Sequence, residues 1–356
     1  MEPKYIILKK QIIESILKGD FKIDEMLTSE NQLAERYKIS RHTVRQTMAE
    51  LVNEGYIYKK QGKGTFIADS SNRKDTSLKV GIMGTYEDYI FPSIINGVEK
   101  VLAPEGYNIL LFNTGGKVDK EAMLLQNILN LNLDGLIVEP TKSALPNPNI
   151  LFYKEILKKK IPLIFINGCY PDLKTYCVHV DDFLAGYMAT KHLIDLGHKN
   201  IAAIFKVDDI QGHERYKGYL KALRESGLAI NENAVIWYSR EEEDTILDQE
   251  KDVCNLSRIA NSSAIIAYND KISLELVNLL KRNNIQVPED ISIVSFDDST
   301  LAVITEVKLT SITHPKEGLG VRTANLLLKI KSEQKIPLDD VTVPELIVRS
   351  SSKNII

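Results

Sequence analysis

The sequence predicts an α/β protein with a small, mostly helical N-terminal domain and a larger doubly wound domain of two lobes. The first residues carry short amphipathic helices followed by a hairpin pattern. From residue 78 onward, short apolar runs typical of buried parallel strands alternate with helical stretches over about 270 residues. A chain of 356 residues has room for two or three domains, and strand–helix alternation of that length favours two lobes.

The N-terminal segment predicts three helices. Residues 5–17 place apolar side chains at helical spacing, which indicates a first helix. A capping box of the S-x-x-Q type at 29–32 begins a second helix that reaches Tyr37. After a tight turn, Ser40 is a good N-cap for a third helix that ends at Gly55. Two short helices joined by a tight turn, the second rich in hydrogen-bond donors at its start, predict a helix-turn-helix.

A hairpin is expected directly after the third helix. Strand-like segments at 56–58 and 65–67 flank a tip with the sequence Gln61-Gly62-Lys63-Gly64. Glycines let a backbone approach a phosphate closely, and the lysines at 59, 60 and 63 supply positive charge. The hairpin is therefore predicted to be a DNA-binding wing.

These residues resemble the winged DNA-binding domain of GntR-type bacterial repressors. The matching motifs are S-E-x-x-L-A at 29–34, S-R-x-T-V-R at 40–45, L-x-x-E-G at 51–55 and G-x-G-T-F at 62–66. The resemblance implies that the third helix and the hairpin contact bases and phosphates. The DNA-binding candidates are Lys4, Glu30, Arg41, His42, Thr43, Arg45, Gln46, Gln61, Gly62, Lys63 and Gly64.

Charge and composition fit this division of the chain. Residues 1–68 carry a net charge of +3 and the remainder −6, as expected for a basic head that binds a polyanion and an acidic body that does not. No run of about 18 apolar residues and no signal-peptide pattern occurs, so a cytoplasmic protein is expected. The three cysteines lack metal-ligand spacing and are interpreted as small buried hydrophobes, so no metal site is predicted.

Polar residues follow the predicted strands of the larger domain, after a short polar linker at 69–77. In doubly wound sheets, ligands bind at the carboxyl ends of the strands. Aromatic, carboxylate and amide side chains there suit a neutral polyol, because aromatic faces cover CH groups and hydroxyls need paired donors and acceptors. Each residue alone is weak evidence, since Asp or Asn after a strand is more often a helix cap.

The stretch from Leu78 to about Ser350 resembles the effector domain of LacI/GalR-type regulators, whose fold is that of periplasmic binding proteins. The matching motifs are R-x-x-G-[FWY] at 215–219, N-D at 269–270, V-P-x-D-[IL]-S-[IV]-x-[GS]-[FY]-D-[DN] at 287–298 and L-T-[ST]-[IV] at 309–312. The resemblance implies a sugar site in which Arg215, Asn269 and Asp297 hold hydroxyls.

Other residues are assigned to the same site by this resemblance. Tyr89 and Phe91 are expected to line one side, Asn167 and His314 to add polar contacts, and Trp237 to approach the sugar ring, although a lone Trp is more often a core residue. Glu139 and Lys206 are further candidates, with an ion pair across the cleft as the alternative role. The effector-binding candidates are therefore Tyr89, Phe91, Glu139, Asn167, Lys206, Arg215, Trp237, Asn269, Asp297 and His314.

The two modules together resemble the AraR family of bacterial arabinose-utilisation repressors, which join a GntR-type head to a LacI-type effector domain. Strings at 88–93, 139–144 and 206–212 resemble that family more closely than the general LacI pattern. The expected domains are 1–68 for the head and 78–356 for the effector domain. Within the latter, lobe 1 is expected at about 78–178 and 316–342, and lobe 2 at about 179–315 and 343–350.

The expected function is that of a homodimeric repressor, released from two DNA half-sites by a small sugar. L-arabinose is favoured by the resemblance; another pentose, a hexose or a purine would need similar residue types. A solute-binding protein shares the two-lobed architecture, but the missing signal peptide and the winged head argue against it. No P-loop, dinucleotide GxGxxG or G-x-S-x-G motif occurs, so neither an enzyme nor a cofactor is expected.

Overall fold

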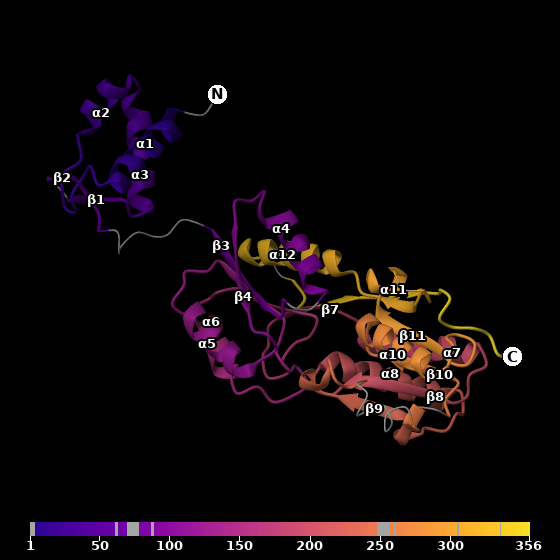
Figure 1. Ribbon diagram of the computed structural model, residues 1–356. Helices are drawn as coiled ribbons and strands as arrows, with labels where there is room; N and C mark the ends of the chain where they lie inside the picture. Colours follow the sequence, from indigo (N-terminus) through magenta and orange to yellow (C-terminus); the bar gives the residue numbers. More distant parts are fainter. Residues whose placement is uncertain are drawn as a thin grey trace. The chain divides into compact units, whose positions relative to one another are not determined.

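The computed structural model divides the chain into two units, Met1–Ser77 and Leu78–Ile356 (Figure 1). It describes residues 4–60, 63–69, 78–86, 89–247, 257–259, 261–304, 306–334 and 336–356. The wing tip residues Gln61 and Gly62 lie outside this range, as does most of the expected linker.

The first unit has three helices followed by a two-stranded hairpin. Its elements are α1 (Lys4–Lys18), α2 (Glu30–Tyr37), α3 (Arg41–Asn53), β1 (Ile57–Lys60) and β2 (Gly64–Ile67). The predicted capping box is present at Ser29 and Gln32, and Ser40 caps α3 by accepting a hydrogen bond from the backbone N–H of Thr43 at 3.1 Å. Lys38 turns the chain between α2 and α3 in the left-handed conformation (φ 51°). The predicted helix-turn-helix is therefore confirmed.

A single apolar core holds this unit together. It takes Leu8, Ile12 and Ile16 from one face of α1, and Val44 and Met48 from α3. The hairpin closes the core, because Ile57 and Ile67 are register partners in the antiparallel pair β1–β2 and both are buried. The apolar stripe of α3 thus faces inward, which leaves the opposite side of that helix exposed.

Lobe 1 of the second unit is a six-stranded parallel sheet in the order β13-β7-β6-β5-β3-β4. Its strands are β3 (Lys79–Gly84), β4 (Asn108–Asn113), β5 (Gly135–Val138), β6 (Leu163–Ile166), β7 (Tyr176–Val180) and β13 (Asp339–Thr342). Its helices are α4 (Phe91–Leu102), α5 (Val118–Ile128), α6 (Ile150–Lys158) and α12 (Lys316–Lys331). One core cluster joins α4 and α12 to one face of the sheet, and a second joins α5 and α6 to the other.

Lobe 2 repeats this plan with strand order β14-β12-β11-β10-β8-β9, in which only the edge strand β14 is antiparallel. Its strands are β8 (Ile201–Lys206), β9 (Val235–Tyr238), β10 (Ala264–Ala267), β11 (Ser292–Asp297), β12 (Thr310–Thr313) and β14 (Leu346–Ile347). Its helices include α7 (Asp182–Asp195), α8 (Ile210–Glu225), α10 (Asp270–Arg282) and α11 (Leu301–Ile304). Helices α7 and α8 cover one face of the sheet and α10 covers the other.

Each lobe contains one very close helix pair. Helices α4 and α12 lie side by side in Figure 1, and a Cβ at Gly97 would come within 2.1 Å of the carbonyl oxygen of Glu317. Helices α7 and α8 approach equally closely, because a Cβ at Gly218 would lie 2.1 Å from the carbonyl oxygen of Phe183. The glycine of the R-x-x-G motif is therefore required by helix packing.

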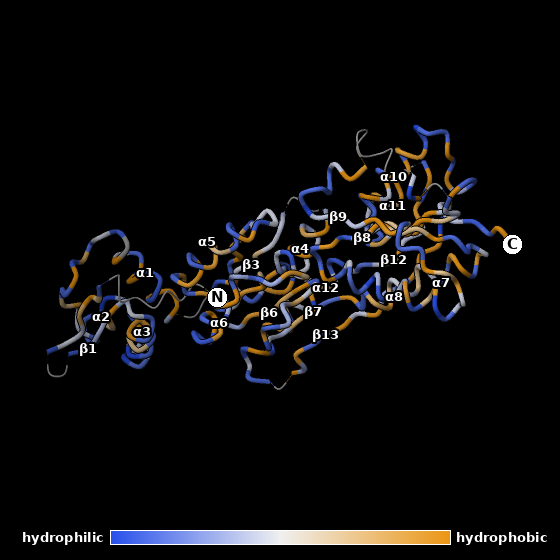
Figure 2. The backbone as a smooth tube through the Cα atoms, turned by 90° about the horizontal axis from the view of Figure 1, so that it is seen from below, coloured by the Kyte–Doolittle hydropathy of each residue, from blue (hydrophilic) through white to orange (hydrophobic). Residues whose placement is uncertain are grey.

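The chain crosses between the lobes three times, after β7, after β12 and after β13. Strand β7 ends at Val180, so lobe 1 extends slightly beyond the expected boundary at residue 178. The central strands β6 and β8 are largely hydrophobic (Figure 2), whereas the edge strand β13 begins with two aspartates. The predicted fold class, a winged helix-turn-helix head with a two-lobed doubly wound domain, is confirmed.

Candidate functional site

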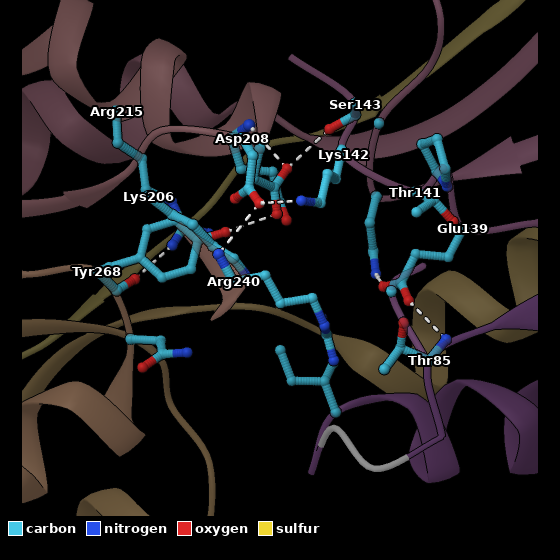
Figure 3. A pocket seen from close by; sticks show the side chains of 18 of the residues that line it. Thr85, Glu139, Thr141, Lys142, Ser143, Lys206, Asp208, Arg215, Arg240 and Tyr268 are labelled. Carbon is cyan, nitrogen blue, oxygen red and sulfur yellow. Dashed lines mark hydrogen bonds and ion pairs between the residues drawn. The ribbon is translucent and has the colours of Figure 1, made fainter. Parts of the chain in front are cut away.

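A polar pocket lies between the two lobes, at the carboxyl ends of their strands (Figure 3). It encloses about 740 Å³, including open solvent at its mouth. Its lining residues are Thr85, Ile90, Gly116, Glu139, Pro140, Thr141, Lys142, Ser143, Asn167, Gly168, Lys206, Asp208, Asp209, Gln211, Arg215, Arg240, Tyr268, Asn269 and Asp297. This is the place where ligands of doubly wound sheets bind.

Side chains of the loop after β5, in lobe 1, bind directly to residues of lobe 2. The ammonium group of Lys142 donates to Glu241 Oε1 at 2.6 Å and lies 3.8 Å from Asp208 Oδ2. The hydroxyl of Ser143 donates to Asp209 Oδ1 at 2.9 Å and accepts from the backbone N–H of Ile210, also at 2.9 Å. The lobes are therefore held together by hydrogen bonds and ion pairs on this side of the pocket.

Arg215 is a buried cation of lobe 2. Its Nε donates to Asp182 Oδ1 at 2.8 Å, its Nη1 donates to the carbonyl of Tyr268 at 2.6 Å, and its Nη2 lies 3.9 Å from Asp297 Oδ1. The guanidinium also stacks on the Phe296 ring at 4.4 Å. Burial would lower the pKa of Arg215, but Asp182, Tyr268 and Asp297 together outweigh burial and raise it, so the side chain stays charged.

A hydrogen-bonded chain runs through Asn167 at the end of β6. Its Nδ2 donates to Glu139 Oε1 at 2.9 Å, and its Oδ1 lies 3.2 Å from His314 Nε2. Burial lowers the pKa of His314 to about 4, so the ring is neutral at pH 7. With Nε2 donating to Asn167, the other ring nitrogen is an acceptor. Because Asn167 is in lobe 1 and His314 directly follows β12 of lobe 2, this series of hydrogen bonds also joins the lobes.

Asp297 of lobe 2 accepts two hydrogen bonds from residues of lobe 1. The hydroxyl of Tyr89 donates to Asp297 Oδ2, and the ammonium of Lys316 donates to the Asp297 carbonyl. Asp297 has φ 97°, and Asn167 has φ 67°. Non-glycine residues seldom adopt positive φ, and such strain concentrates at functional sites.

Two buried oxygen atoms in the pocket wall lack partners. Thr141 Oγ1 and Asp208 Oδ1 make no hydrogen bond with any residue that the structure describes, and neither does the nearby His314 Nδ1. The pocket lining contains four cationic side chains and four carboxylates, so the wall has no net charge to complement. A neutral ligand with several hydroxyl groups can satisfy unpartnered acceptors of this kind without bringing a charge.

Six of the predicted effector residues line the pocket: Glu139, Asn167, Lys206, Arg215, Asn269 and Asp297. Asn269 also caps α10, because its Oδ1 accepts from the backbone N–H of Ile272 at 2.9 Å. Lys206 forms an ion pair with Glu243 at 3.3 Å, which lies within lobe 2 and not across the cleft. Tyr89 and His314 contact lining residues without lining the pocket themselves.

Two predicted effector residues lie elsewhere. Phe91 is only 1% exposed and packs in the core of lobe 1, because it opens α4 on the face that covers the sheet. Trp237 packs edge-on against Tyr216 and at a tilt against His213 between β9 and α8, with ring centroids 5.1 and 5.2 Å apart. Both assignments rested on the resemblance to LacI/GalR-type regulators, which does not reveal the direction of these side chains.

Sequence analysis overlooked several lining residues. Lys142, Ser143, Asp208, Asp209 and Tyr268 line the pocket but were not among the candidates. All follow the ends of strands β5, β8 and β10, so their position in the chain was the signal that could have identified them.

The exposed side of α3 carries the predicted DNA-reading residues. Arg41, His42, Arg45 and Gln46 are exposed there, and Thr43 is partly exposed, with its hydroxyl 2.8 Å from that of Ser40. The α3 stripe of Val44 and Met48 is buried against α1, so these donors face away from the core.

Glu30 links the helix-turn-helix to the hairpin. Its carboxylate lies 3.4 Å from Arg45 Nε of α3 and 3.4 Å from Lys59 Nζ of β1. Lys63 and Gly64 are exposed at the hairpin, while Lys4 is the first residue of α1. The predicted contacts Gln61 and Gly62 lie outside the described residues.

Comparison with known proteins agrees with both units. Residues 5–67 match the family described as bacterial regulatory proteins, gntR family, and residues 190–352 match the periplasmic binding protein-like domain. The crystal structure of the transcription regulator CcpA of Lactococcus lactis is 26% identical, with a TM-score of 0.68, and the match covers 78% of this chain and 100% of that one. Within the described residues, no helix is long and apolar enough to span a membrane. A winged DNA-binding head joined to a two-lobed ligand-binding domain defines a ligand-responsive transcription regulator.

Two relatives match nearly the whole chain. The arabinose metabolism transcriptional repressor of Halalkalibacterium halodurans is 42% identical over 99% of this chain and 97% of the relative. The protein of the same name from Geobacillus stearothermophilus is 39% identical over 99% and 98%. The chain belongs to the family of arabinose metabolism transcriptional repressors. It is a sugar-responsive repressor with a DNA-binding head and a sugar-binding domain, and not an enzyme.

Proposed function

We propose that this repressor acts as a cytoplasmic homodimer on operator DNA and that L-arabinose releases it. The observation that carries the choice of ligand class is the pocket between the lobes, with its balanced charges and its unpartnered Thr141 and Asp208 oxygens. The choice of arabinose within that class rests on the two relatives named for arabinose metabolism.

The pocket chemistry suits a small polyol. Arg215 and Asn269 offer donors, and Asp208 and Asp297 offer acceptors, to hydroxyl groups of the sugar. The cationic and anionic side chains of the wall are equal in number, so the charge of an ionic ligand would be buried without a net opposite charge in the wall.

Sugar binding is coupled to closure of the two lobes, because side chains around the pocket contact each other across the lobes only when the lobes are closed. Ser143 with Asp209, and Asn167 with His314, join opposite lobes around the pocket. A sugar between the lobes strengthens the closed arrangement, because it adds hydrogen bonds to both. For the sugar to act as an inducer, it must bind the DNA-free state more tightly than the DNA-bound state.

In the proposed complex each head inserts α3 into a major groove, with two heads spanning half-sites about one helical turn apart or a multiple of it. Arg41, His42 and Arg45 contact bases or phosphates, and Lys63 contacts phosphate from the wing. Glu30 holds Arg45 and Lys59 in position through its two ion pairs.

The test titrates L-arabinose, D-ribose, D-galactose and hypoxanthine into the full-length protein by calorimetry. The best ligand is then added to a complex of the protein with operator DNA selected from random duplexes. We expect L-arabinose to bind in a ratio of one per chain and to release the DNA, with two chains per operator. Tighter binding and release by another compound would refute the choice of arabinose, and failure of every compound to bind would refute the sugar pocket.

A further inference from the structure

A cluster of side chains that are typical metal ligands lies at the edge of the lobe 1 sheet. We call it the edge cluster; its members are Cys169, Cys177, His179 and Asp339. Cys169, Cys177 and His179 line a cavity of about 780 Å³, which includes open solvent and shares Asn167 and Gly168 with the sugar pocket. The function described above does not use any member of this cluster.

Strand register brings three members to the same face. Strands β7 and β13 pair in parallel, with Asp339 opposite Cys177 and Val341 opposite His179. Cys177 and His179 are two residues apart, so their side chains project from one face of the sheet, which the register partner Asp339 shares. The ligand atoms of Cys177, His179 and Asp339 all lie within 4.8 Å of one another.

The imidazole of His179 is oriented as in a metal site. Its Nδ1 lies 2.9 Å from the carbonyl of Val180, to which it can only donate, so in a neutral ring Nε2 carries the lone pair. Metal-binding histidines commonly make this second hydrogen bond to a carbonyl. Nε2 lies 2.8 Å from Asp339 Oδ1, and two lone pairs at that distance repel each other. The ring relieves this repulsion by taking up a proton or by sharing a cation with Asp339.

The Cys169 thiol lies beside that of Cys177 and interacts with it, but it is not among the three ligand atoms that lie within 4.8 Å of one another. Two sulfur atoms, an imidazole nitrogen and a carboxylate oxygen are the donors that Zn²⁺ takes in four-coordinate sites. In a tetrahedral site the nitrogen and oxygen would be about 3.3 Å apart. The Asp339 side chain is 64% exposed and therefore free to make the small outward movement that this requires.

We propose that the edge cluster binds one divalent ion of the zinc class. Sequence analysis predicted no metal site, because the cysteines lack metal-ligand spacing and Asp339 lies 160 residues from His179. The ion would fix the start of β13 to β7, and both of these strands lead into crossings between the lobes.

The test adds Co²⁺ to the full-length protein in a reductant that does not bind metals. We expect a thiolate-to-cobalt charge-transfer absorption and the intense visible bands of tetrahedral cobalt, saturating at one ion per chain and removed by Zn²⁺. Asp339→Asn should weaken Co²⁺ binding by roughly tenfold or more, because it removes an exposed ligand without disturbing the core. Cys177→Ser should weaken the charge-transfer absorption, because only the Cys169 thiolate would remain.

One variant serves as a matched control. Asp340→Asn changes the neighbouring residue, which pairs with Arg322 and is not part of the edge cluster, and should leave Co²⁺ affinity unchanged. If the wild-type protein shows no thiolate-to-cobalt absorption, or if Asp339→Asn and Asp340→Asn bind Co²⁺ equally well, the cluster is only a His–Asp ion pair beside two thiols and the proposal fails.

Discussion

Asp208→Asn tests whether the unpartnered oxygen of the pocket receives the sugar. Asp208 is 2% exposed; its Oδ2 accepts from the backbone N–H of Arg240 at 3.1 Å, while its Oδ1 has no partner among the described residues. The substitution preserves size and the bond to Arg240 but replaces the free acceptor with an NH₂ donor. Hydrogen bonds to a charged group contribute about 1.5–3 kcal/mol, so the dissociation constant for the sugar should rise roughly 10- to 150-fold.

Calorimetry measures this affinity. Operator binding without sugar should stay within about twofold of the wild type, a change of under about 0.5 kcal/mol, because Asp208 lies in the sugar-binding domain and not in the DNA-binding head. Asp208 also lies 3.8 Å from the Lys142 ammonium, so part of the effect could come from the contact between the lobes. Glu241→Gln separates the two contributions, because it weakens the same lysine's exposed ion pair and should change sugar affinity by at most about 1 kcal/mol. Sugar affinity of Asp208→Asn within twofold of the wild type would refute the assignment of this oxygen.

Four further outcomes are expected. Arg45→Ala should weaken operator binding by about 1–3 kcal/mol without changing sugar affinity in calorimetry; loss of both would contradict separate modules. Lys63→Ala should reduce the slope of log affinity against log salt by about 1 in DNA titrations, and an unchanged slope would exclude a phosphate contact. Burial lowers the pKa of His314 from 6.5 to about 4, so its contribution to stability is complete above pH 6.5 and is lost as the pH falls toward 4. His314→Asn should therefore flatten urea-derived unfolding free energies in that window, whereas an unaltered pH profile would mean that the ring does not titrate there. Gly218→Ala should destabilise the protein by about 1–3 kcal/mol in thermal melts, because the new Cβ would meet a carbonyl at 2.1 Å, whereas Gly318→Ala, with ordinary contact at 3.6 Å, should not.

Local features of the fold were predictable because they depend on neighbouring residues. Ser29 and Ser40 cap α2 and α3 as their sequence contexts predict. The apolar runs of the central strands were equally visible, since strands buried on both faces must be apolar along their whole length.

Contacts between distant segments were not predictable in this way. Lys142 and Glu241 are 99 residues apart, and nothing in their spacing indicates that the closed lobes bring them together. Phe91 shows the opposite error: the family resemblance placed it in the pocket, but the orientation of α4 turns its ring into the core. The direction of a side chain depends on which face of its helix packs on the sheet. The first few residues of a helix do not determine that face.

The discontinuous construction of lobe 1 has a consequence for biosynthesis. Its sheet is completed by β13 and one of its faces is covered by α12, both of which follow all the strands of lobe 2 except the edge strand β14. The DNA-binding head is formed from consecutive residues with its own core. At about 5–20 residues per second, synthesis from residue 70 to Thr342 takes roughly 14–55 s. During that interval a ribosome carries a head that can already fold, while the lobe that completes the sugar sensor still lacks its last strand.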